Sequence, residues 1–348
     1  MGTLGLSLST FCGFALHRPM QHAHRLQYLR KNDPMKSNSM LMALSCAAIA
    51  LTSITAQATA TKSSGGACGA KGVAVQVLGS GGPEMRGRAS SSYIVWLDGK
   101  ARVLVDAGGG SALRFGESGA RMADVDAVLF SHFHSDHSAD FPVLVKSSHF
   151  ETPARKRLLP VFGPTGTPLI PSTTDFLAGL FGEKTGVFRY LGSAGNEKTY
   201  DFEPHDLALG EAETQVVFDR DGVRISATPV IHAKIPALAF LVEIYGQRIA
   251  FSGDGNGNNG NLQKLALDSD VLVAHLAIDD SFHFGERSLH APPGLIGEIA
   301  AAAKTKQVIL SHRRPETLGK EQELQATIAK TYKGPIAYAD DLDCFTLR

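Results

Sequence analysis

The chain has 348 residues, and 43% of them are hydrophobic, enough for the core of one large domain or two small ones. Its 34 basic and 34 acidic side chains cancel to a formal net charge of zero at pH 7. Nothing in this balance favours a nucleic-acid partner or attraction to a membrane surface.

The N-terminal segment 1–60 has the layout of a targeting sequence. Its first part is basic, an apolar run follows from about Met40 to Ile54, and Ala56–Ala60 resembles a signal-peptidase site. We expect export to the periplasm or outside the cell, with cleavage after Ala60. Met35 gives a better-proportioned signal start than Met1 and is therefore a candidate for the true start codon. An uncleaved anchor is the alternative to cleavage. Because the apolar run is short, no stable membrane span is expected in the mature form.

Of the four cysteines, only Cys68 and Cys344 remain after such cleavage. They lie near opposite ends of the mature chain, and an oxidising compartment would permit a disulfide between them. Their spacing alone leaves the pairing open. No Cys-x-x-Cys pair exists, which argues against a cysteine-based zinc site.

Beyond the targeting segment, the patterning predicts an α/β domain over residues 72–348, preceded by a flexible leader at 61–71. Asp98-Gly99 and Tyr245-Gly246 each lie between strand-like runs and predict hairpin turns. The polar stretch 183–214 is interpreted as an excursion over the surface. Strands are predicted at 73–78, 92–97, 102–105, 127–130, 215–218, 224–228, 239–244, 248–251 and 308–310, and helices at 138–148, 173–181, 293–304 and 320–330.

Four metal-ligating side chains directly follow the predicted strand at 127–130. They are His132, His134, Asp136 and His137. The first two are two residues apart and can reach one ion from an extended loop, and the other two would then face a neighbouring ion. Imidazole and carboxylate together suit first-row divalent ions, chiefly zinc, with iron or manganese as alternatives. A polar loop that happens to be rich in histidine is the competing interpretation.

Three more apolar segments end in a polar side chain that suits a metal. These side chains are His232, Asp254 and His312. Taken singly, each is better explained as a structural capping residue. Because residues at the ends of different strands can converge on one edge of a sheet, we expect all three to share a site with the 132–137 cluster.

These motifs resemble those of the metallo-β-lactamase superfamily, in particular its ribonuclease Z-like and arylsulfatase-like branch. The His-x-His-x-Asp-His signature of that family matches in full, and Asp106 corresponds to an aspartate that supports the site without binding metal. The resemblance spans residues 73 to 340 and implies a four-layer αββα sandwich. Its motifs are residues 79–83, 104–108, 132–137, 232–240, 252–254 and 310–312.

The resemblance also implies two divalent metal ions, with Zn²⁺ in the first place and Mn²⁺ or Fe²⁺ as alternatives. His132, His134 and His232 would bind one ion, Asp136, His137 and His312 the other, and Asp254 would bridge them. Two such ions, two carboxylates and one hydroxide leave about one unit of positive charge, which favours anionic esters.

Two further histidines are candidates for proton transfer, and Asp136 is a candidate catalytic residue as well as a ligand. His290 resembles the proton-handling histidine of the ribonuclease Z pattern. His275 resembles the histidine of that family's His-Glu-Ala motif, but Leu276 stands in place of the glutamate. The replacement matters because a glutamate would orient its partner histidine. A structural, hydrogen-bonded histidine is the alternative for both.

We therefore expect an exported dinuclear metal-dependent hydrolase of a small anionic ester, either a phosphodiester or a sulfate ester, with a metal-bridging hydroxide as nucleophile. A lactone or β-lactam hydrolase and a ribonuclease Z-type nuclease are enzyme alternatives, and a metal-binding protein on a hydrolase scaffold is the non-enzyme alternative. The zero net charge and the lack of a long basic, glycine-rich insertion argue against nucleic acid as a partner. A homodimer is compatible with the sequence.

Overall fold

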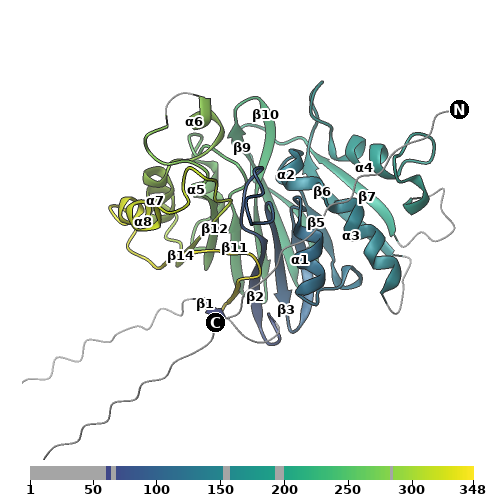
Figure 1. Ribbon diagram of the computed structural model, residues 1–348, viewed down its shortest axis with the longest axis horizontal. Helices are drawn as coiled ribbons and strands as arrows, with labels where there is room; N and C mark the ends of the chain where they lie inside the picture. Colours follow the sequence, from purple (N-terminus) through teal and green to yellow (C-terminus); the bar gives the residue numbers. More distant parts are fainter. Residues whose placement is uncertain (1–59, 64–67, 152–156, 193–199, 283–284) are drawn as a thin grey trace, which may run out of the picture. The chain divides into compact units, whose positions relative to one another are not determined.

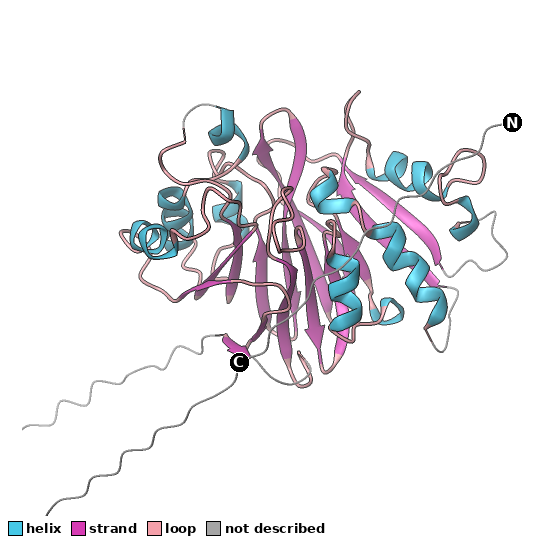
Figure 2. Ribbon diagram, in the orientation of Figure 1, coloured by secondary structure: helices cyan, strands magenta, loops and turns pink. Residues whose placement is uncertain are grey.

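The computed structural model describes residues 60–63, 68–151, 157–192, 200–282 and 285–348, which all fall within the structural unit 55–348. The predicted targeting segment lies outside the described residues up to residue 59. Two mixed β-sheets form the centre of the unit, and helices cover their outer faces (Figure 1, Figure 2). This arrangement confirms the predicted αββα sandwich.

Among the described residues, eight strands form the first sheet and seven the second. In spatial order the first contains β1 (Thr61–Ser63), β15 (Cys344–Thr346), β2 (Val73–Gly79), β3 (Ser92–Leu97), β4 (Lys100–Val105), β5 (Ala127–Leu129), β6 (Arg157–Pro164) and β7 (Tyr200–Leu207). The second contains β14 (Ile336–Tyr338), β13 (Gln307–Ser311), β12 (Val271–His275), β11 (Gln247–Phe251), β10 (Ile235–Ile244), β9 (Val223–His232) and β8 (Gln215–Arg220).

The helices divide into two groups, one on the outer face of each sheet (Figure 1). The group over the first sheet is α1 (Ser111–Glu117), α2 (Ser135–Ser138), α3 (Phe141–Ser147) and α4 (Thr173–Phe181). The group beside the second is α5 (Asn261–Leu265), α6 (Gly285–Leu289), α7 (Pro293–Ala302) and α8 (Glu321–Ile328). No helix among the described residues is long and apolar enough to cross a membrane.

Strand β2 shows how an almost continuous apolar run serves a sheet that is covered on both faces. Val73, Val75 and Val77 belong to the apolar core between the two sheets. Ala74 and Leu78 point the opposite way, into the core beneath the first group of helices. Because successive side chains of a strand alternate between faces, a strand buried on both sides needs apolar residues at nearly every position.

Both predicted hairpin turns are confirmed. Asp98 and Gly99 join β3 to β4 with φ angles of 47° and 78°. Tyr245 and Gly246 join β10 to β11 with φ angles of 50° and 79°. Positive φ at both central residues is the geometry of two-residue turns that match the twist of antiparallel strands.

The single helix predicted at 138–148 is wrong, because α2 ends at Ser138 and α3 begins only at Phe141. Pro142 explains the break. It has no N–H, so a continuous helix would leave the carbonyl group of Ser138 without its hydrogen bond and would bring that carbonyl against the proline ring.

Two stretches predicted to be irregular contain strands. Within 183–214, strand β7 pairs in parallel with β6 at the edge of the first sheet. Most β7 side chains are polar and only partly buried, and Pro204 is tolerated because an edge strand needs fewer N–H donors, so no apolar run marked it. Within 61–71, Thr61–Ser63 form β1 and pair with β15 instead of remaining flexible.

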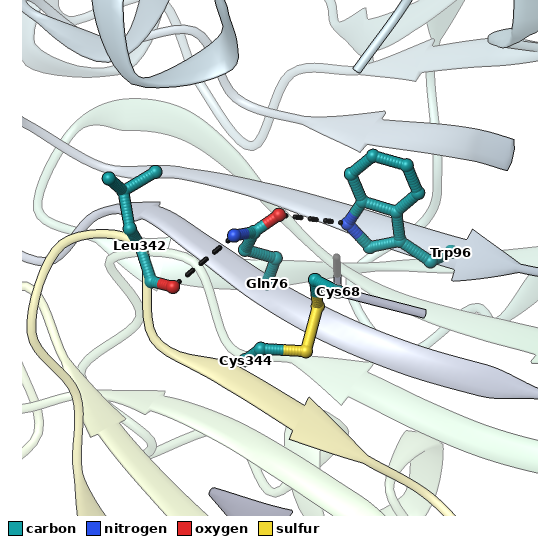
Figure 3. Close-up of a disulfide and its surroundings, with 5 residues drawn as sticks. All are labelled: Cys68, Gln76, Trp96, Leu342 and Cys344. Atoms are coloured by element: carbon teal, nitrogen blue, oxygen red, sulfur yellow. Dashed lines mark hydrogen bonds between the residues drawn. A yellow bond between two sulfur atoms is a disulfide. The ribbon is translucent and has the colours of Figure 1, made fainter. Parts of the chain in front are cut away.

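A disulfide joins Cys68 to Cys344, whose Cα atoms are 5.6 Å apart (Figure 3). Gln76 lies beside it, donating to the carbonyl oxygen of Leu342 over 3.2 Å and accepting from the indole N–H of Trp96 over 3.1 Å. The bridge therefore ties the start of the described fold to its last strand.

Candidate metal centre

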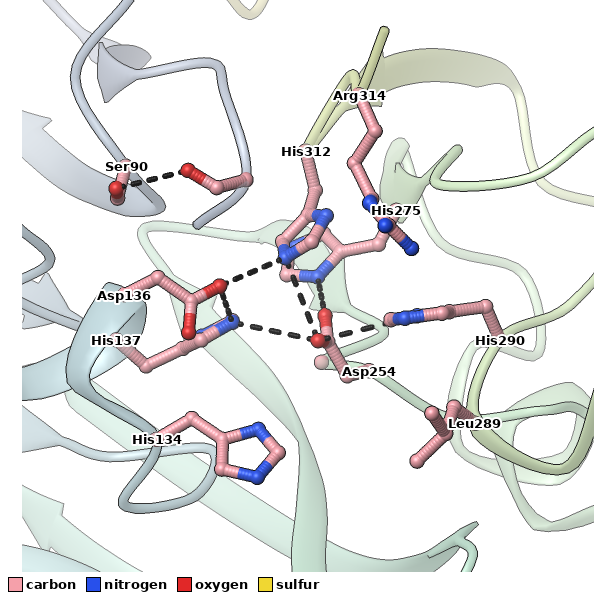
Figure 4. A network of polar contacts seen from close by, with 12 residues as sticks. Ser90, His134, Asp136, His137, Asp254, His275, Leu289, His290, His312 and Arg314 are labelled. Carbon is pink, nitrogen blue, oxygen red and sulfur yellow. Dashed lines mark hydrogen bonds and ion pairs between the residues drawn. The ribbon is translucent and has the colours of Figure 1, made fainter. Parts of the chain in front are cut away.

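The seven predicted ligands converge at one edge of the two sheets, and we call this group the candidate metal centre. Figure 4 shows His134, Asp136, His137, Asp254 and His312 of this group. Strands β11, β12 and β13 run parallel, so their carboxyl ends meet at the same edge. His132, His134, Asp136 and His137 follow β5, His232 ends β9, Asp254 follows β11 and His312 follows β13.

One part of the centre consists of three imidazoles. Nε2 of His132 lies 2.9 Å from Nδ1 of His134, which lies 3.4 Å from Nε2 of His232. Nitrogen atoms this close, on rings that come from two separate segments, can face a single ion.

The other part combines imidazole with carboxylate. Oδ2 of Asp136 lies 3.3 Å from Nε2 of His312 and 3.5 Å from Nε2 of His137. Asp254 lies between the two parts, with its Oδ2 3.3 Å from His312, 3.4 Å from His137 and 3.9 Å from His132.

The residues present fit a divalent metal, which the fold family implies. Nε2 of His137 and Nε2 of His312 are buried and have no hydrogen-bond partner. A buried polar atom without a partner lowers the stability of the fold by about 1–3 kcal/mol, and coordination of a metal ion would remove that cost. His312 also has a φ of 53°, a strained value for this residue type that is typical of functional positions.

Charge supports the same interpretation in the three-imidazole part. Burial lowers the pKa of His132 well below its usual value and lowers that of His134, so both rings are neutral at pH 7, as a ligand must be. In the other part, burial acts in the same direction on His137 and His312, but nearby carboxylates, Asp254 foremost, outweigh it and raise the pKa of both rings, that of His312 to about 9. Burial raises the pKa of Asp254, but the His312 and His137 rings outweigh this effect and hold it well below its usual range. The carboxylate between the two parts is therefore ionised.

Asp106 supports the centre from behind, as the resemblance implied. Its carboxylate accepts from the backbone N–H of Ser131 over 2.7 Å, from the Ser131 hydroxyl over 2.8 Å and from Nδ1 of His137 over 2.8 Å. The last bond leaves Nε2 of His137 facing the site. In the same way, Nδ1 of His232 donates to the carbonyl oxygen of Leu289 over 2.9 Å.

His290 borders the ligand set. It follows α6, is buried, and its Nδ1 lies 3.8 Å from Oδ2 of Asp254 without a hydrogen-bond partner (Figure 4). Burial lowers the pKa of His290 to about 3. The ring is therefore neutral at pH 7 and needs a nearby negative charge to take up a proton.

His275 takes a different place from the one that a proton-transfer role suggested. Its Nδ1 is 2.6 Å from Oδ1 of Asp254, and its Nε2 is 2.9 Å from the hydroxyl of Tyr93, so both ring nitrogens are engaged. Leu276 is fully buried in the core beside the second sheet. Sequence reasoning missed Tyr93 because it lies in an apolar strand and belongs to no motif.

The two arginines after His312 differ in position. Arg313 is buried away from the centre, where it bonds Glu321 and stacks on Tyr338. Arg314 lies beside the centre (Figure 4). It donates to Glu84 over 2.8 Å and to Glu286 over 2.9 Å. It thereby fastens the loop after β2 to the helix that precedes His290.

Comparison with known proteins is consistent with this geometry. A family described as beta-lactamase superfamily domain matches residues 101–313. Ribonuclease Z of Mycobacterium marinum is 30% identical over 282 residues, 78% of this chain and 97% of that protein. Ribonuclease Z of Mycolicibacterium paratuberculosis is 28% identical over 283 residues, 78% of this chain and 96% of that protein.

Solved structures share the fold. The short form of human tRNase Z superimposes with a TM-score of 0.60 at 19% identity, covering 79% of this chain and 99% of that one. The metallo-β-lactamase fold protein YhfI from Bacillus subtilis gives 0.59 at 18% identity, covering 78% and 98%. At these identities the likeness concerns the fold alone.

The prediction that argued against a nucleic-acid partner is wrong, because relatives similar to this chain over most of their length are named ribonuclease Z. That prediction rested on the zero net charge and on the lack of a long basic, glycine-rich insertion, and net charge averages over the whole surface. Divalent ions supply positive charge locally whatever the total charge of the chain, so the average does not report on the site.

Proposed function

Because the chain belongs to the metallo-β-lactamase superfamily, we propose that this hydrolase cleaves phosphodiester bonds in RNA. The likeness to ribonuclease Z, which extends over 97% of the M. marinum protein, carries the proposal. RNA replaces the small anionic ester that the sequence alone favoured, and of the two esters named there it shares its reacting group with the phosphodiester, not with the sulfate ester.

The arrangement of side chains suits two divalent ions, zinc in the first place. His132, His134 and His232 would hold one, Asp136, His137 and His312 the other, with Asp254 between them. When bound, such ions generate a nucleophile from water near neutral pH and neutralise charge on the phosphate.

The protein's own contribution is orientation and proton transfer. Asp106 and the Leu289 carbonyl fix which nitrogens of His137 and His232 face the metal centre. His290 lies at the border of the centre, where the negative charge of a bound phosphodiester would raise its pKa and let it pass a proton to the leaving oxygen.

We also propose that the protein acts outside the cytoplasm. The disulfide between Cys68 and Cys344 supports this location, because such bonds persist in oxidising compartments. Mass spectrometry of native protein tests the cleavage, and a mature N-terminus directly after Ala60 is expected. Full-length protein recovered from the cytoplasmic fraction would contradict the location, whereas full-length protein outside the cytoplasm would indicate the uncleaved anchor.

The activity is tested with zinc-loaded protein, a transfer-RNA transcript, an unstructured RNA and bis-p-nitrophenyl phosphate. We expect RNA cleavage that a chelator abolishes and added zinc restores. The variant His312→Asn, purified in the same way, is the control for contaminating nucleases and should be inactive. Zinc-loaded protein that hydrolyses the small diester and leaves both RNAs intact would refute the RNA proposal.

A further inference from the structure

A chain of buried hydrogen bonds runs from the candidate metal centre into the core between the sheets. Oδ1 of Asp254 lies 2.6 Å from Nδ1 of His275, whose Nε2 lies 2.9 Å from the Tyr93 hydroxyl. That hydroxyl lies 3.0 Å from Oγ of Ser311. All four side chains are at least nine-tenths buried, so no bulk solvent competes for these bonds.

The chemistry of these groups sets the direction of the bonds. A carboxylate only accepts, so Nδ1 of His275 carries a proton and donates it to Asp254. In a neutral imidazole the other nitrogen, Nε2, can only accept, and it lies 2.9 Å from the Tyr93 hydroxyl, whose single proton is shared between His275 and Ser311. Asp254 sets the tautomer of His275, and the contact with Tyr93 at the second ring nitrogen holds the ring in place.

The hydrogen-bond chain also crosses the sandwich. Tyr93 belongs to β3 of the first sheet, whereas His275 and Ser311 are the last residues of β12 and β13 in the second. The Tyr93 ring packs against Phe251, which ends β11 just before Asp254, with ring centroids 5.6 Å apart. Residues from both sheets therefore support the Asp254 carboxylate.

We propose that Tyr93 and His275 are positioning residues that orient Asp254 between the two halves of the metal centre. With Oδ1 bound to His275, only Oδ2 faces the ligand nitrogens, at 3.3 Å from His312 and 3.4 Å from His137. Without that donor the carboxylate could rotate and offer either oxygen. This inference rests on the proposed metal site but not on the identity of the substrate.

Zinc affinity of the metal-free protein, measured by competition with a chromophoric chelator, tests the proposal. His275→Phe keeps a ring of similar size but removes the donor, and we expect zinc binding to weaken about 10–100-fold. His275→Asn places an amide N–H near the position of Nδ1 and should recover much of this loss. Tyr93→Phe, which removes only the hydroxyl, should weaken binding in the same direction.

Tyr332→Phe is the matched control. Tyr332 is also buried, and its hydroxyl donates to the carbonyl oxygen of Thr305, which lies outside the hydrogen-bond chain. We expect Tyr332→Phe to bind zinc with wild-type affinity. Wild-type affinity in His275→Phe, no recovery in His275→Asn, or an equal loss in the two tyrosine variants would each overturn the proposal.

A second readout separates positioning from a purely structural role. The rise in melting temperature on adding zinc should shrink in Tyr93→Phe, because that rise depends on metal affinity. An unchanged rise from a lower starting temperature would mean that the hydroxyl only stabilises the fold. Since no substrate is present, wild-type protein that binds zinc but leaves RNA intact would refute the proposed function alone.

Discussion

Each histidine around the candidate metal centre has two ring nitrogens, and their partners decide what the residue can do. His137 uses Nδ1 to bond Asp106, and His232 uses Nδ1 to bond the Leu289 carbonyl, so each presents Nε2 to the site. His275 has partners at both nitrogens and offers neither. His290 has no hydrogen-bond partner at Nδ1, the atom nearest Asp254, which suits proton transfer.

Replacing His290 tests its role as proton donor. In His290→Ala we expect RNA hydrolysis to fall about 10²–10⁴-fold, because the leaving oxygen loses its general acid. Zinc content should stay at the wild-type value, measured by metal analysis of the same samples. His205→Ala is the control, since His205 stacks on Phe162 outside the centre. Wild-type rates in His290→Ala would remove the residue from the mechanism.

At the scale of secondary-structure elements, the turn after β4 and the short helix α2 meet backbone to backbone. The N–H of Ala107 donates to the carbonyl oxygen of His137 over 2.7 Å, and the N–H of Asp140 donates to Ala107 over 2.9 Å. A Cβ atom on Gly108 would lie 2.1 Å from the carbonyl oxygen of Asp136. The glycine is therefore required for this close approach, which places both Asp136 and His137.

Gly108→Ala should be destabilising, because relieving a backbone clash moves α2. We expect a loss of about 1–3 kcal/mol in the free energy of unfolding, as for other overpacked sites, together with reduced zinc content. Denaturant unfolding and metal analysis measure the two effects. Gly116→Ala, in helix α1 with open space around its Cβ position, should be neutral or stabilising. Equal free energies of unfolding and equal zinc contents in the two variants would contradict the required close approach at Gly108.

On the scale of the whole molecule, the beginning and the end of the described chain are joined to each other. Strand β1 pairs with β15, and the disulfide joins residues that are 276 positions apart. In the unfolded state this bridge would restrict almost the entire domain, and long closed loops lose the most entropy.

Removing the disulfide should therefore lower stability more than activity. For Cys68→Ala combined with Cys344→Ala we expect a loss of about 3–5 kcal/mol in the free energy of unfolding. Wild-type protein should approach the same value once it is reduced, whereas the double variant should not respond to reductant. Identical denaturation midpoints with and without reductant in the wild type would show that the bridge contributes nothing.

Much of the fold could be predicted from local patterns. Strands β2, β3 and β4, the two hairpin turns and helix α4 follow from apolar runs, Asp-Gly or Tyr-Gly pairs and helical periodicity. Strand β7 could not be predicted, because an edge strand with polar side chains has no distinctive pattern. The break before α3 follows from Pro142, which the first turn of α3 tolerates but a helix that begins at residue 138 does not.

The sequence by itself determined which side chains are available to a metal and that they follow strands, since ligand chemistry and strand periodicity are both local properties. Only the tertiary structure decided which distant residues contact the ligands' neighbours and which cysteines pair. Tyr93 reaches His275 because two sheets pack face to face, and Cys68 meets Cys344 because the first and last described strands pair. Such contacts join residues far apart in the chain, and no local pattern encodes a distance between them.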